Sequence, residues 1–337
     1  MSEVVWTVDD ALERTRAAFV ACRTSDDNAE AVAKALVRAE LDGLPSHGLS
    51  RVPANAAQAR AGKVDGFAVP RIEKVRAGAI RIDAATGFAF PALAAGLPVL
   101  TEAARQQGVA AAALANSHHA GVLGHVVEDL AAQGLFGIAM SNTPAAIAPW
   151  GGKKGSFGTN PIAFGAPLPD APPIVIDLSL SKVARGKIML AANSGEPIPE
   201  GWAFDGDGNT TTDPKAAMSG TLAPMGDAKG AQLALMVELL STVLTGANFA
   251  YAASSMFDDK GGPPRLGQFI LAVAPEGFGY TGALERTAEL ARRIESDGEA
   301  RLPGRRRLED RERIRANGIS LDERLADTIT GLAAANP

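Results

Sequence analysis

Residues 109–134 read VAAAALANSHHAGVLGHVVEDLAAQG, and they give the middle of the chain its α/β character. The apolar run Val109–Leu114 predicts a buried strand. A helix is expected at about 121–133, because an apolar periodic pattern follows the turn and Gly134 ends it. The next apolar run, Leu135–Met140, predicts a second strand.

The flanking segments extend this pattern toward both ends of the chain. The first sixty residues read as three helices, which begin near Asp9, at Ser25 and after Gly48. The tail from residue 281 is helical and charged. Further strands are expected at Ile72–Ile82, Ile162–Gly165, Ile174–Ile176 and Gly267–Val273, and further helices at about 90–107, Lys182–Ala192, 230–245 and Asp322–Ala334.

Helices at both ends around a mixed middle predict two domains. Residues 1–75 together with 281–337 form a helical domain, and residues 76–280 form a mixed α/β domain. A chain of 337 residues is longer than one hydrophobic core usually supports, which agrees with this division.

Composition narrows the class of protein. A net charge of −5 argues against nucleic acid or an anionic membrane as a partner. A single cysteine, Cys22, excludes an internal disulfide and fits a reducing compartment. No signal peptide and no apolar stretch of membrane-spanning length are visible, so the protein is expected in the cytoplasm.

One motif is misleading. Gly277–Gly282 fits the G-x-G-x-x-G pattern of a dinucleotide-binding turn, after an expected strand and before a helix. That unit needs a second parallel strand, and residues 297–318 are too charged to supply one. A plain strand-to-helix turn is the better interpretation.

All four histidines lie in two short segments, which suggests a role in proton transfer near neutral pH. His47 stands in a turn between two helices, and Arg51 follows it on the same helical face. Such a pair suits a carboxylate substrate, since Arg51 grips the carboxylate while His47 protonates a neighbouring oxygen or nitrogen. The alternative is a helix-capping histidine beside a solvated arginine.

The segment Asn116–Leu123 joins a strand to a helix N-terminus, where backbone N–H groups favour a phosphate. An ordinary turn is one alternative. A metal site is another, with His118, His119 and His125 joined by Glu128 or Asp129, although this spacing matches no common zinc pattern.

Three further turns are candidates for binding. Gly158–Pro161 and Asp177–Ser179 each lie at the edge of an expected strand. Pro224–Gly230 opens an apolar helix and places Lys229 beside its N-terminus.

Together these segments resemble the family of NAD(P)-dependent oxidoreductases that includes type-2 malate/L-lactate dehydrogenases, sulfolactate dehydrogenase, ureidoglycolate dehydrogenase, diketogulonate reductase and piperideine-carboxylate reductase. The strings that carry the resemblance are Asp42–Arg51, Asn116–Gly124, Ala148–Phe164, Asp177–Ile188, Pro199–Asp205, Thr211–Pro214 and Pro224–Glu238. The resemblance implies a non-Rossmann, sulfolactate-dehydrogenase-like fold. It combines a mixed β-sheet domain for NAD or NADP with a helical domain formed by both chain ends, in a homodimer.

The resemblance also implies roles for individual residues. His47 corresponds to the proton donor, Ser46 to its hydrogen-bonding partner and Arg51 to the carboxylate clamp, while His119 lies on the cofactor loop or acts as the catalytic base. Thr159 corresponds to a substrate contact, and Arg185 is a second candidate for the substrate carboxylate. The implied cofactor contacts are His119, Ala120, Gly121, Val122, Leu123, Asp177, Leu178, Ser179, Gly226, Asp227, Lys229, Pro303, Gly304 and Arg305, and no metal is expected.

Departures from the family pattern bear on cofactor and substrate. Asp227 replaces a usual glycine near a phosphate or ribose, and Asn55 replaces a usual aromatic residue, which enlarges or wets the substrate pocket. Lys187 stands where imine reductases commonly have an acidic residue. We therefore expect a dehydrogenase of small 2-hydroxy acids such as malate, lactate or sulfolactate. The alternatives are an NADPH-dependent reductase of cyclic imines and, more distantly, a metal-dependent hydrolase.

The choice between NAD and NADP stays open at this point. The basic run that includes Arg301, Arg305, Arg306 and Arg307 either holds a 2′-phosphate or forms a solvated face.

Overall fold

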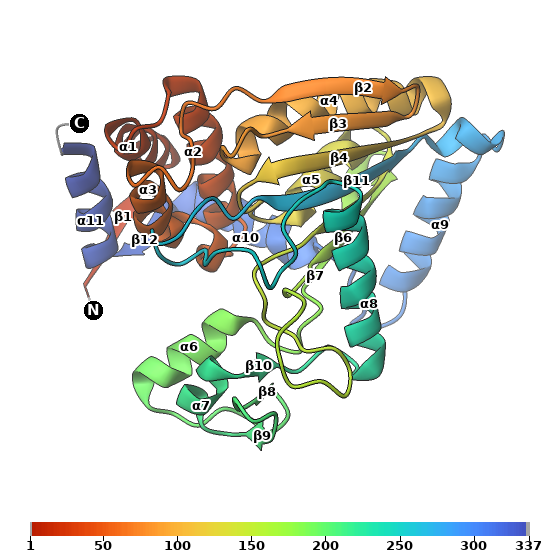
Figure 1. Ribbon diagram of the computed structural model, residues 1–337. Coiled ribbons are helices and arrows are strands. Elements are labelled where there is room, and N and C mark those ends of the chain that lie inside the picture. Colours follow the sequence, from red (N-terminus) through yellow and green to blue (C-terminus); the bar gives the residue numbers. More distant parts are fainter. Residues whose placement is uncertain (1, 335–337) are drawn as a thin grey trace.

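A computed structural model describes residues 2–334 and is built around one seven-stranded sheet (Figure 1). Its strands are β2 (Arg71–Arg76), β3 (Ala79–Asp83), β4 (Val109–Ser117), β5 (Phe136–Ser141), β6 (Ile162–Leu168), β7 (Ala171–Leu178) and β11 (Leu266–Val273). Their order is β2-β3-β4-β11-β5-β6-β7, and β3 and β4 are parallel while the other neighbours are antiparallel. The predicted mixed sheet is therefore confirmed.

Helices cover both faces of this sheet. The helices α4 (Ala89–Gln107) and α5 (Leu123–Ala132) pack on one face, and α8 (Ala228–Glu238) packs on the other (Figure 1). Strand β5 shows the alternation, because Ala139 belongs to the core under α4 and α5 while Met140 packs with residues of α8. Sheet positions on both faces are therefore apolar.

The apolar helix expected over 230–245 does not continue as an α-helix. It changes to the π-helix η3 (Leu239–Val243). The hydroxyls of Thr242 and Thr245 donate to the carbonyls of Glu238 and Ser241, both at 2.6 Å, and so compete with the backbone ladder.

The two chain ends meet. Strands β1 (Glu3–Trp6) and β12 (Ile319–Asp322) pair in antiparallel fashion, beside the helices α1 (Val8–Ala21), α2 (Asp26–Leu41), α3 (Val52–Arg60) and α11 (Glu323–Ala334). One core joins Phe19 and Leu36 from the first helices with Ile319 and Ile329 from the tail. Neither strand is among the predicted elements, because four residues are too few to show a clear alternation.

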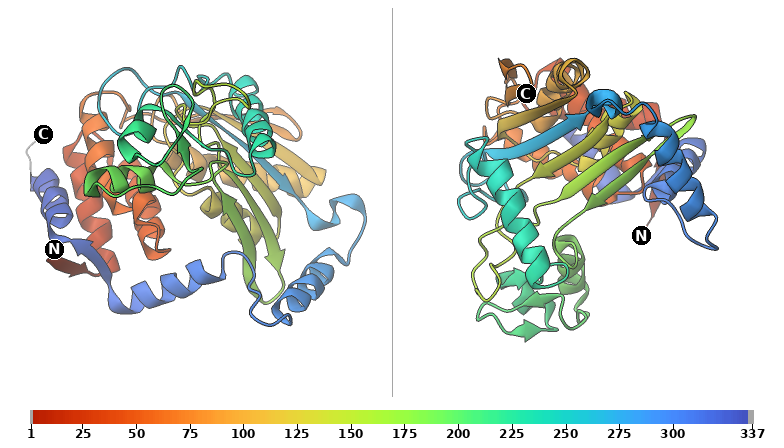
Figure 2. Two further views of the ribbon diagram at one scale, coloured as in Figure 1. Left: turned by 90° about the horizontal axis from the view of Figure 1, so that it is seen from below. Right: turned by 90° about the vertical axis from the view of Figure 1, so that its right-hand side faces the viewer.

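The remaining tail helices run between the two ends of the molecule (Figure 2). Helix α9 (Ala283–Glu295) packs against β6, and α10 (Arg305–Asn317) returns to α2. The 3-10 turn η4 (Pro275–Phe278) overlaps the start of the Gly277–Gly282 turn, and α9 follows this turn. Strand β11 is antiparallel to both of its neighbours, so the turn is not part of a dinucleotide-binding βαβ unit.

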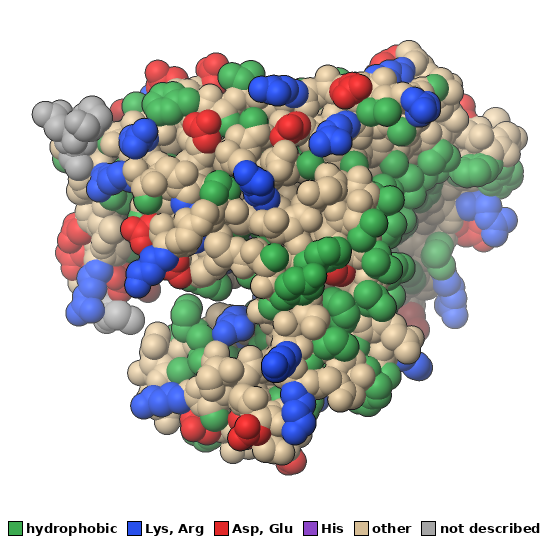
Figure 3. Space-filling model, viewed as in Figure 1, with side chains coloured by type: hydrophobic (Ala, Val, Ile, Leu, Met, Phe, Trp, Pro, Cys, Tyr) green, Lys and Arg blue, Asp and Glu red, His purple; other side chains and the backbone are tan. Residues whose placement is uncertain are grey.

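A small lobe projects from the body of the molecule, and a hollow separates the two in Figure 3. It contains α6 (Arg185–Ser194), α7 (Pro214–Ser219), β8 (Ala203–Phe204), β9 (Thr210–Thr211) and β10 (Thr221–Leu222). Its core includes Val183, Ile188 and Leu222. Within residues 2–334, no helix is both long and apolar enough to cross a membrane.

Candidate active site

Close contacts with Glu40 determine the backbone conformation of the segment around His47. Two 3-10 turns, η1 (Pro45–His47) and η2 (Leu49–Arg51), precede α3. The sequence predicted a turn at His47 and a helix directly after Gly48, whereas the α-helix begins only at Val52. A Cβ on Gly48 would lie 2.1 Å from Oε2 of Glu40, so any other residue here would displace this carboxylate. The same oxygen accepts a hydrogen bond from the Leu49 N–H at 2.8 Å. Helix α2 thereby fixes the turn that presents His47.

The predicted catalytic pair is linked through Ser46. The Ser46 Oγ lies 3.0 Å from Nδ1 of His47, and the Arg51 Nε donates to the Ser46 carbonyl at 2.9 Å. These contacts leave Nε2 of His47 and both terminal nitrogens of Arg51 for a ligand. A planar guanidinium with two free N–H groups on each terminal nitrogen suits a carboxylate.

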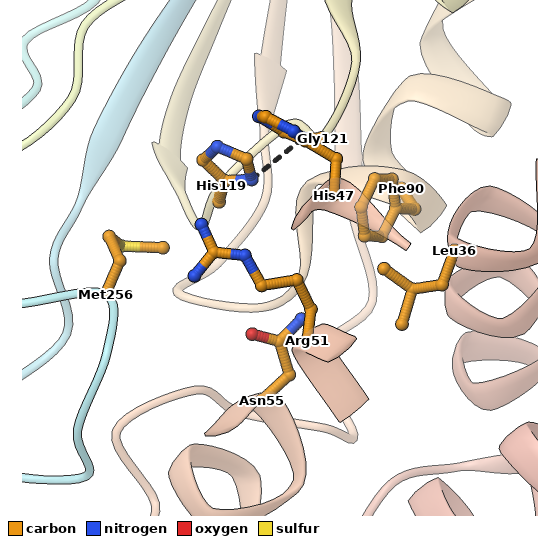
Figure 4. Close-up of a pocket in the computed structure, with 8 residues that line it drawn as sticks. All are labelled: Leu36, His47, Arg51, Asn55, Phe90, His119, Gly121 and Met256. Carbon is orange, nitrogen blue, oxygen red and sulfur yellow. Dashed lines mark hydrogen bonds between the residues drawn. The ribbon is translucent and has the colours of Figure 1, made fainter. Parts of the chain in front are cut away.

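His119 reaches the same place from the strand-to-helix turn. Its Nδ1 accepts a hydrogen bond from the Gly121 N–H at 3.1 Å (Figure 4). Its ring stacks on the ring of His47, with centroids 5.6 Å apart and planes inclined by 29°. Two segments more than seventy positions apart thus present two imidazoles side by side.

A pocket collects these side chains (Figure 4). It is lined by Leu36, His47, Arg51, Asn55, Phe90, His119, Gly121 and Met256. The sequence did not point to Leu36, Phe90 or Met256, because an apolar residue that lines a pocket has the same local pattern as one in the core. Arg51 is the one cation among these lining residues of the described chain.

At pH 7 and without a ligand, His47 and His119 are both neutral, because their pKa values lie below this pH. Burial, followed by the charges of Arg51 and His125, lowers the pKa of His47 to about 4. Burial and the charge of Arg51 also hold the pKa of His119 well below 6.5. A substrate anion bound to Arg51 would offset part of this charge effect and raise both pKa values.

The other two histidines point elsewhere, which removes the basis for a shared metal site. The His118 Nε2 lies 2.7 Å from Oε1 of Gln58, and the His125 Nε2 lies 2.9 Å from Oδ2 of Asp42. In the part of the chain that the structure describes, no three acidic, histidine or cysteine side chains converge as metal ligands. The histidine cluster of the sequence therefore separates into three different environments.

Asp42 belongs to a buried charged network between α2, α5 and α10. Arg311 contacts Asp42 at 2.6 Å and Glu128 at 2.7 Å, and Arg307 contacts Glu128 at 2.9 Å. Burial opposes ionisation of Asp42, but hydrogen bonds from His125 and Arg311 outweigh it and lower its pKa to about 2. This network ties the helices of both chain ends to the helix after the histidine turn.

The predicted cofactor segments surround the end of β7. The Gly124 N–H donates to Oδ2 of Asp177 at 2.7 Å, which joins the histidine turn to this strand. The Met225 N–H donates to the Leu180 carbonyl at 2.8 Å, which adds the turn before α8. The Val175 N–H donates to the Pro303 carbonyl at 3.4 Å, which adds the segment before α10. Four segments far apart in sequence thus meet along β7 and just beyond its end.

The donors present there fit a dinucleotide phosphate. Helix α8 begins after Asp227 without a side-chain cap. The Lys229 N–H donates to the Gly226 carbonyl at 3.2 Å, and the N–H groups of Ala228 and Gly230 have no acceptor within the described residues and can bind an anion beside the Lys229 side chain. A Cβ on Gly226 would meet nothing within 4 Å, so the turn faces open space. Asp227 itself adds a carboxylate at this helix terminus.

Two predicted substrate contacts lie outside the pocket described above. The Thr159 Oγ1 lies 3.2 Å from Oγ1 of Thr143, and its carbonyl accepts a hydrogen bond from the Leu180 N–H, next to the cofactor segments. Arg185 begins α6 in the small lobe and donates to the Met218 carbonyl at 2.9 Å. Arg51, and not Arg185, accompanies His47 in the pocket.

The sequence profile of the Malate/L-lactate dehydrogenase family matches residues 6–330. The (2R)-3-sulfolactate dehydrogenase (NADP(+)) of Chromohalobacter salexigens is 52% identical over 305 residues, which cover 90% of this chain and 91% of that protein. The Δ1-pyrroline-2-carboxylate/Δ1-piperideine-2-carboxylate reductase of Pseudomonas putida is 41% identical over 303 residues, or 87% of this chain and 88% of that protein. The solved structure of Δ1-piperideine-2-carboxylate reductase from Pseudomonas syringae has a TM-score of 0.92 at 38% identity and covers 98% of this chain and 99% of that chain. The resemblance predicted from the motifs is confirmed, and the chain belongs to the malate/L-lactate dehydrogenase family.

Proposed function

We propose that this protein is an NADP-dependent oxidoreductase that interconverts a small 2-hydroxy acid and its 2-oxo acid, with 3-sulfolactate as the first candidate. The placement of His47 beside Arg51 in one pocket carries this proposal. The 52% identity to an NADP(+)-dependent sulfolactate dehydrogenase supports both the cofactor and the substrate class.

In this proposal the substrate carboxylate binds the terminal nitrogens of Arg51. His47 then transfers a proton between its Nε2 and the substrate oxygen, while the Ser46 hydroxyl serves Nδ1 as donor or acceptor in either protonation state. When bound, the nicotinamide supplies hydride for reduction and accepts hydride in oxidation.

The hydrogen bond at His119 supports His47 as the proton carrier. The Nδ1 of His119 accepts from a backbone N–H, so in the neutral ring the hydrogen is on Nε2. A ring in this tautomer can donate a hydrogen bond into the pocket but offers no free nitrogen to take up a proton. We therefore assign His119, with Ala120 to Leu123, to cofactor and substrate positioning.

Reduction of a cyclic imine is the second candidate. Leu36, Phe90 and Met256 give the pocket an apolar wall, and a pyrroline or piperideine carboxylate needs one cation for its single carboxylate. 3-Sulfolactate carries a second anionic group, which has to be met by Asn55 or by the small lobe. The identity of 41% to a reductase of both cyclic imines also supports this candidate.

A substrate panel tests the proposal. Purified protein is mixed with NADPH or NADH and with 3-sulfopyruvate, oxaloacetate, pyruvate, Δ1-pyrroline-2-carboxylate or Δ1-piperideine-2-carboxylate, and the loss of absorbance at the nicotinamide band is followed. We expect turnover with NADPH and the highest kcat/KM with 3-sulfopyruvate. No turnover with any of these compounds would contradict the proposal.

Substitution of Arg51 tests the carboxylate clamp in the same assay. Arg51→Ala should lower kcat/KM at least about tenfold, because a lost charge-assisted hydrogen bond costs about 1.5–3 kcal/mol. Arg51→Lys keeps the charge but loses the planar fork, so KM should still rise. If both variants keep the wild-type kcat/KM, Arg51 is not the clamp and Arg185 is the next residue to test.

We further propose a cytoplasmic homodimer. Large apolar side chains gather along α8 and the segment after it (Figure 3), including exposed Leu233, Met236, Leu239 and Val243. This strip has no charged side chain from Leu239 to Gly246, so a second copy of the same strip is the occupant we propose for it. Sedimentation should give a dimer, and Leu239→Lys should yield monomers.

The division into domains also stays a proposal. A helical domain of residues 1–75 with 281–337 is supported by the shared core of both chain ends, and a cofactor domain of residues 76–280 by the sheet. Helix α9 lies against β6 and so beside the cofactor domain.

A further inference from the structure

One wall of the pocket is an irregular loop. Residues 253–262 lie between η3 and β11 and form neither helix nor strand, yet Met256 from this loop lines the pocket. The ring of the next residue, Phe257, lies under the guanidinium of Arg51, with Cζ of Arg51 4.8 Å from the ring centroid. A segment without secondary structure needs another source of order to hold these two contacts.

That source is the ammonium of Lys63, just past the end of α3. Lys63 is 2% exposed, which is rare for lysine. Its Nζ donates to the carbonyls of Ser255 at 2.7 Å, Asp258 at 3.0 Å and Lys260 at 2.7 Å. An ammonium has three donors, and each of them has a loop carbonyl as its acceptor.

Gln58 adds a second attachment from α3. Its Nε2 donates to the Met256 carbonyl at 3.1 Å, and its Oε1 lies 2.7 Å from Nε2 of His118. Because a carbonyl only accepts, the amide orientation is fixed, and His118 must donate from Nε2. The end of α3 thus holds the loop and the histidine turn together.

We infer that Lys63 is a positioning residue for the substrate carboxylate: it fixes the 253–262 loop so that Phe257 orients Arg51 and Met256 closes the pocket. The inference rests on the proposed function of Arg51. Without the ammonium, three carbonyl oxygens would converge with no donor, and the loop would move outward to be hydrated. The guanidinium would then lose the aromatic face on which it lies.

Steady-state kinetics of Lys63→Met test this role. KM for the 2-oxo acid should rise about tenfold, as for loss of a hydrogen bond to a charged group, while kcat stays within about threefold and the Kd of NADPH is unchanged. Lys260→Met is the matched control, because Lys260 belongs to the same loop but its side chain is exposed. An unchanged KM in Lys63→Met would overturn the inference.

A double-mutant cycle separates positioning from general destabilisation. Phe257→Leu should raise KM about threefold, and Phe257→Tyr, which keeps the aromatic face, should leave it within about twofold of wild type. Combined with Lys63→Met, Phe257→Leu should add nothing further, because the loop is already released. Multiplicative effects would show that Lys63 does not act through Phe257 and would overturn the inference.

Hydrogen exchange gives a readout that needs no activity. In the full-length Lys63→Met protein, amides of 253–262 should exchange faster, while those of β4 and β11 keep their protection. Should Lys63→Met not fold, Lys63→Gln, which retains two donors, replaces it in all three measurements. Unchanged exchange in the loop would also overturn the inference.

A failure of the proposed function can be distinguished from a failure of the positioning role of Lys63. A wild-type protein that turns over none of the panel contradicts the proposed function, whereas the exchange result still reports on Lys63. An active wild type with an unaffected Lys63→Met contradicts only the positioning role.

Discussion

His47 is neutral in the free protein, and this determines the expected pH dependence of the reaction. Its pKa is lowered from 6.5 to about 4, mainly by burial, so the protonated donor form becomes scarcer as pH rises above about 4. In the direction of reduction, kcat/KM should fall about tenfold per pH unit between pH 5 and 8. In the direction of oxidation, where the neutral ring accepts the proton, kcat/KM should be flat over this range.

Substitution of His47 tests whether this residue is the source of the pH dependence. His47→Ala should lower kcat by about 10²–10⁴-fold and abolish the pH dependence, with little change in the Kd of NADPH. Activity within a few-fold of wild type would transfer the proton chemistry to His119.

We expect Asn55 to discriminate between substrates in the same pocket. It is 6% exposed and lines the pocket, and its amide makes no hydrogen bond to another described residue. An amide at the wall of a pocket offers a donor and an acceptor to a polar group on the ligand. Asn55→Leu, of similar size, should therefore lower kcat/KM for 3-sulfopyruvate about tenfold and leave the value for a cyclic imine unchanged or higher. Equal losses for both substrates would contradict this role.

At the scale of single elements, the start of α8 combines strain with charge. Asp227 has φ 57° and ψ −124°, a conformation that favours glycine. Asp227→Gly should raise the free energy of unfolding by about 1 kcal/mol in urea titrations, since strained positions cost about 1–3 kcal/mol each. Asp227→Ala, which keeps the Cβ, should bring no such gain.

The same position should affect cofactor binding independently of strain. Asp227→Asn removes the negative charge but keeps the backbone strain, so it should lower the Kd of NADPH without stabilising the fold. Fluorescence titration with NADPH measures this Kd. A Kd that is the same in wild type, Asp227→Asn and Asp227→Gly would show that the carboxylate points away from the cofactor.

At the scale of the whole molecule, buried neutral histidines make the free energy of unfolding depend on pH. Burial lowers the pKa of His118 to about 3, and the pKa values of His47 and His119 are lowered as well. In the unfolded chain these rings take up protons below about pH 6.5. The folded-state pKa values are depressed, so their contribution to stability is full above about pH 6.5 and is lost as pH falls.

His118 allows this loss to be measured. At pH 4.5 it alone should reduce the free energy of unfolding by about 3 kcal/mol relative to pH 7.5. The His118→Gln variant cannot take up this proton, so its free energy of unfolding should fall less between pH 7.5 and pH 4.5. At pH 7.5 its free energy of unfolding should be lower than that of the wild type. Urea titrations of both proteins at the two pH values test this, and equal losses would contradict it.

The sequence alone predicted those helices and strands in which several neighbouring residues form a clear apolar pattern. The run Val109–Leu114 became part of β4, and the helix expected at about 121–133 became α5. It also identified the segments of His47, Arg51 and His119, because Ser, Gly and Pro around rare histidines mark turns. The motifs were sufficient to predict the family.

Only the tertiary structure decided which of these residues meet. Strands β1 and β12 pair across the whole chain, and Lys63 binds carbonyls 192 to 197 positions away. The sequence around Lys63 predicts the end of a helix, and nothing in it indicates that a distant loop packs there. The adjacent residues His118 and His119 likewise face different partners. Periodicity is a property of neighbours in sequence, whereas burial, pKa and the walls of a pocket depend on contacts that form only when distant segments pack together.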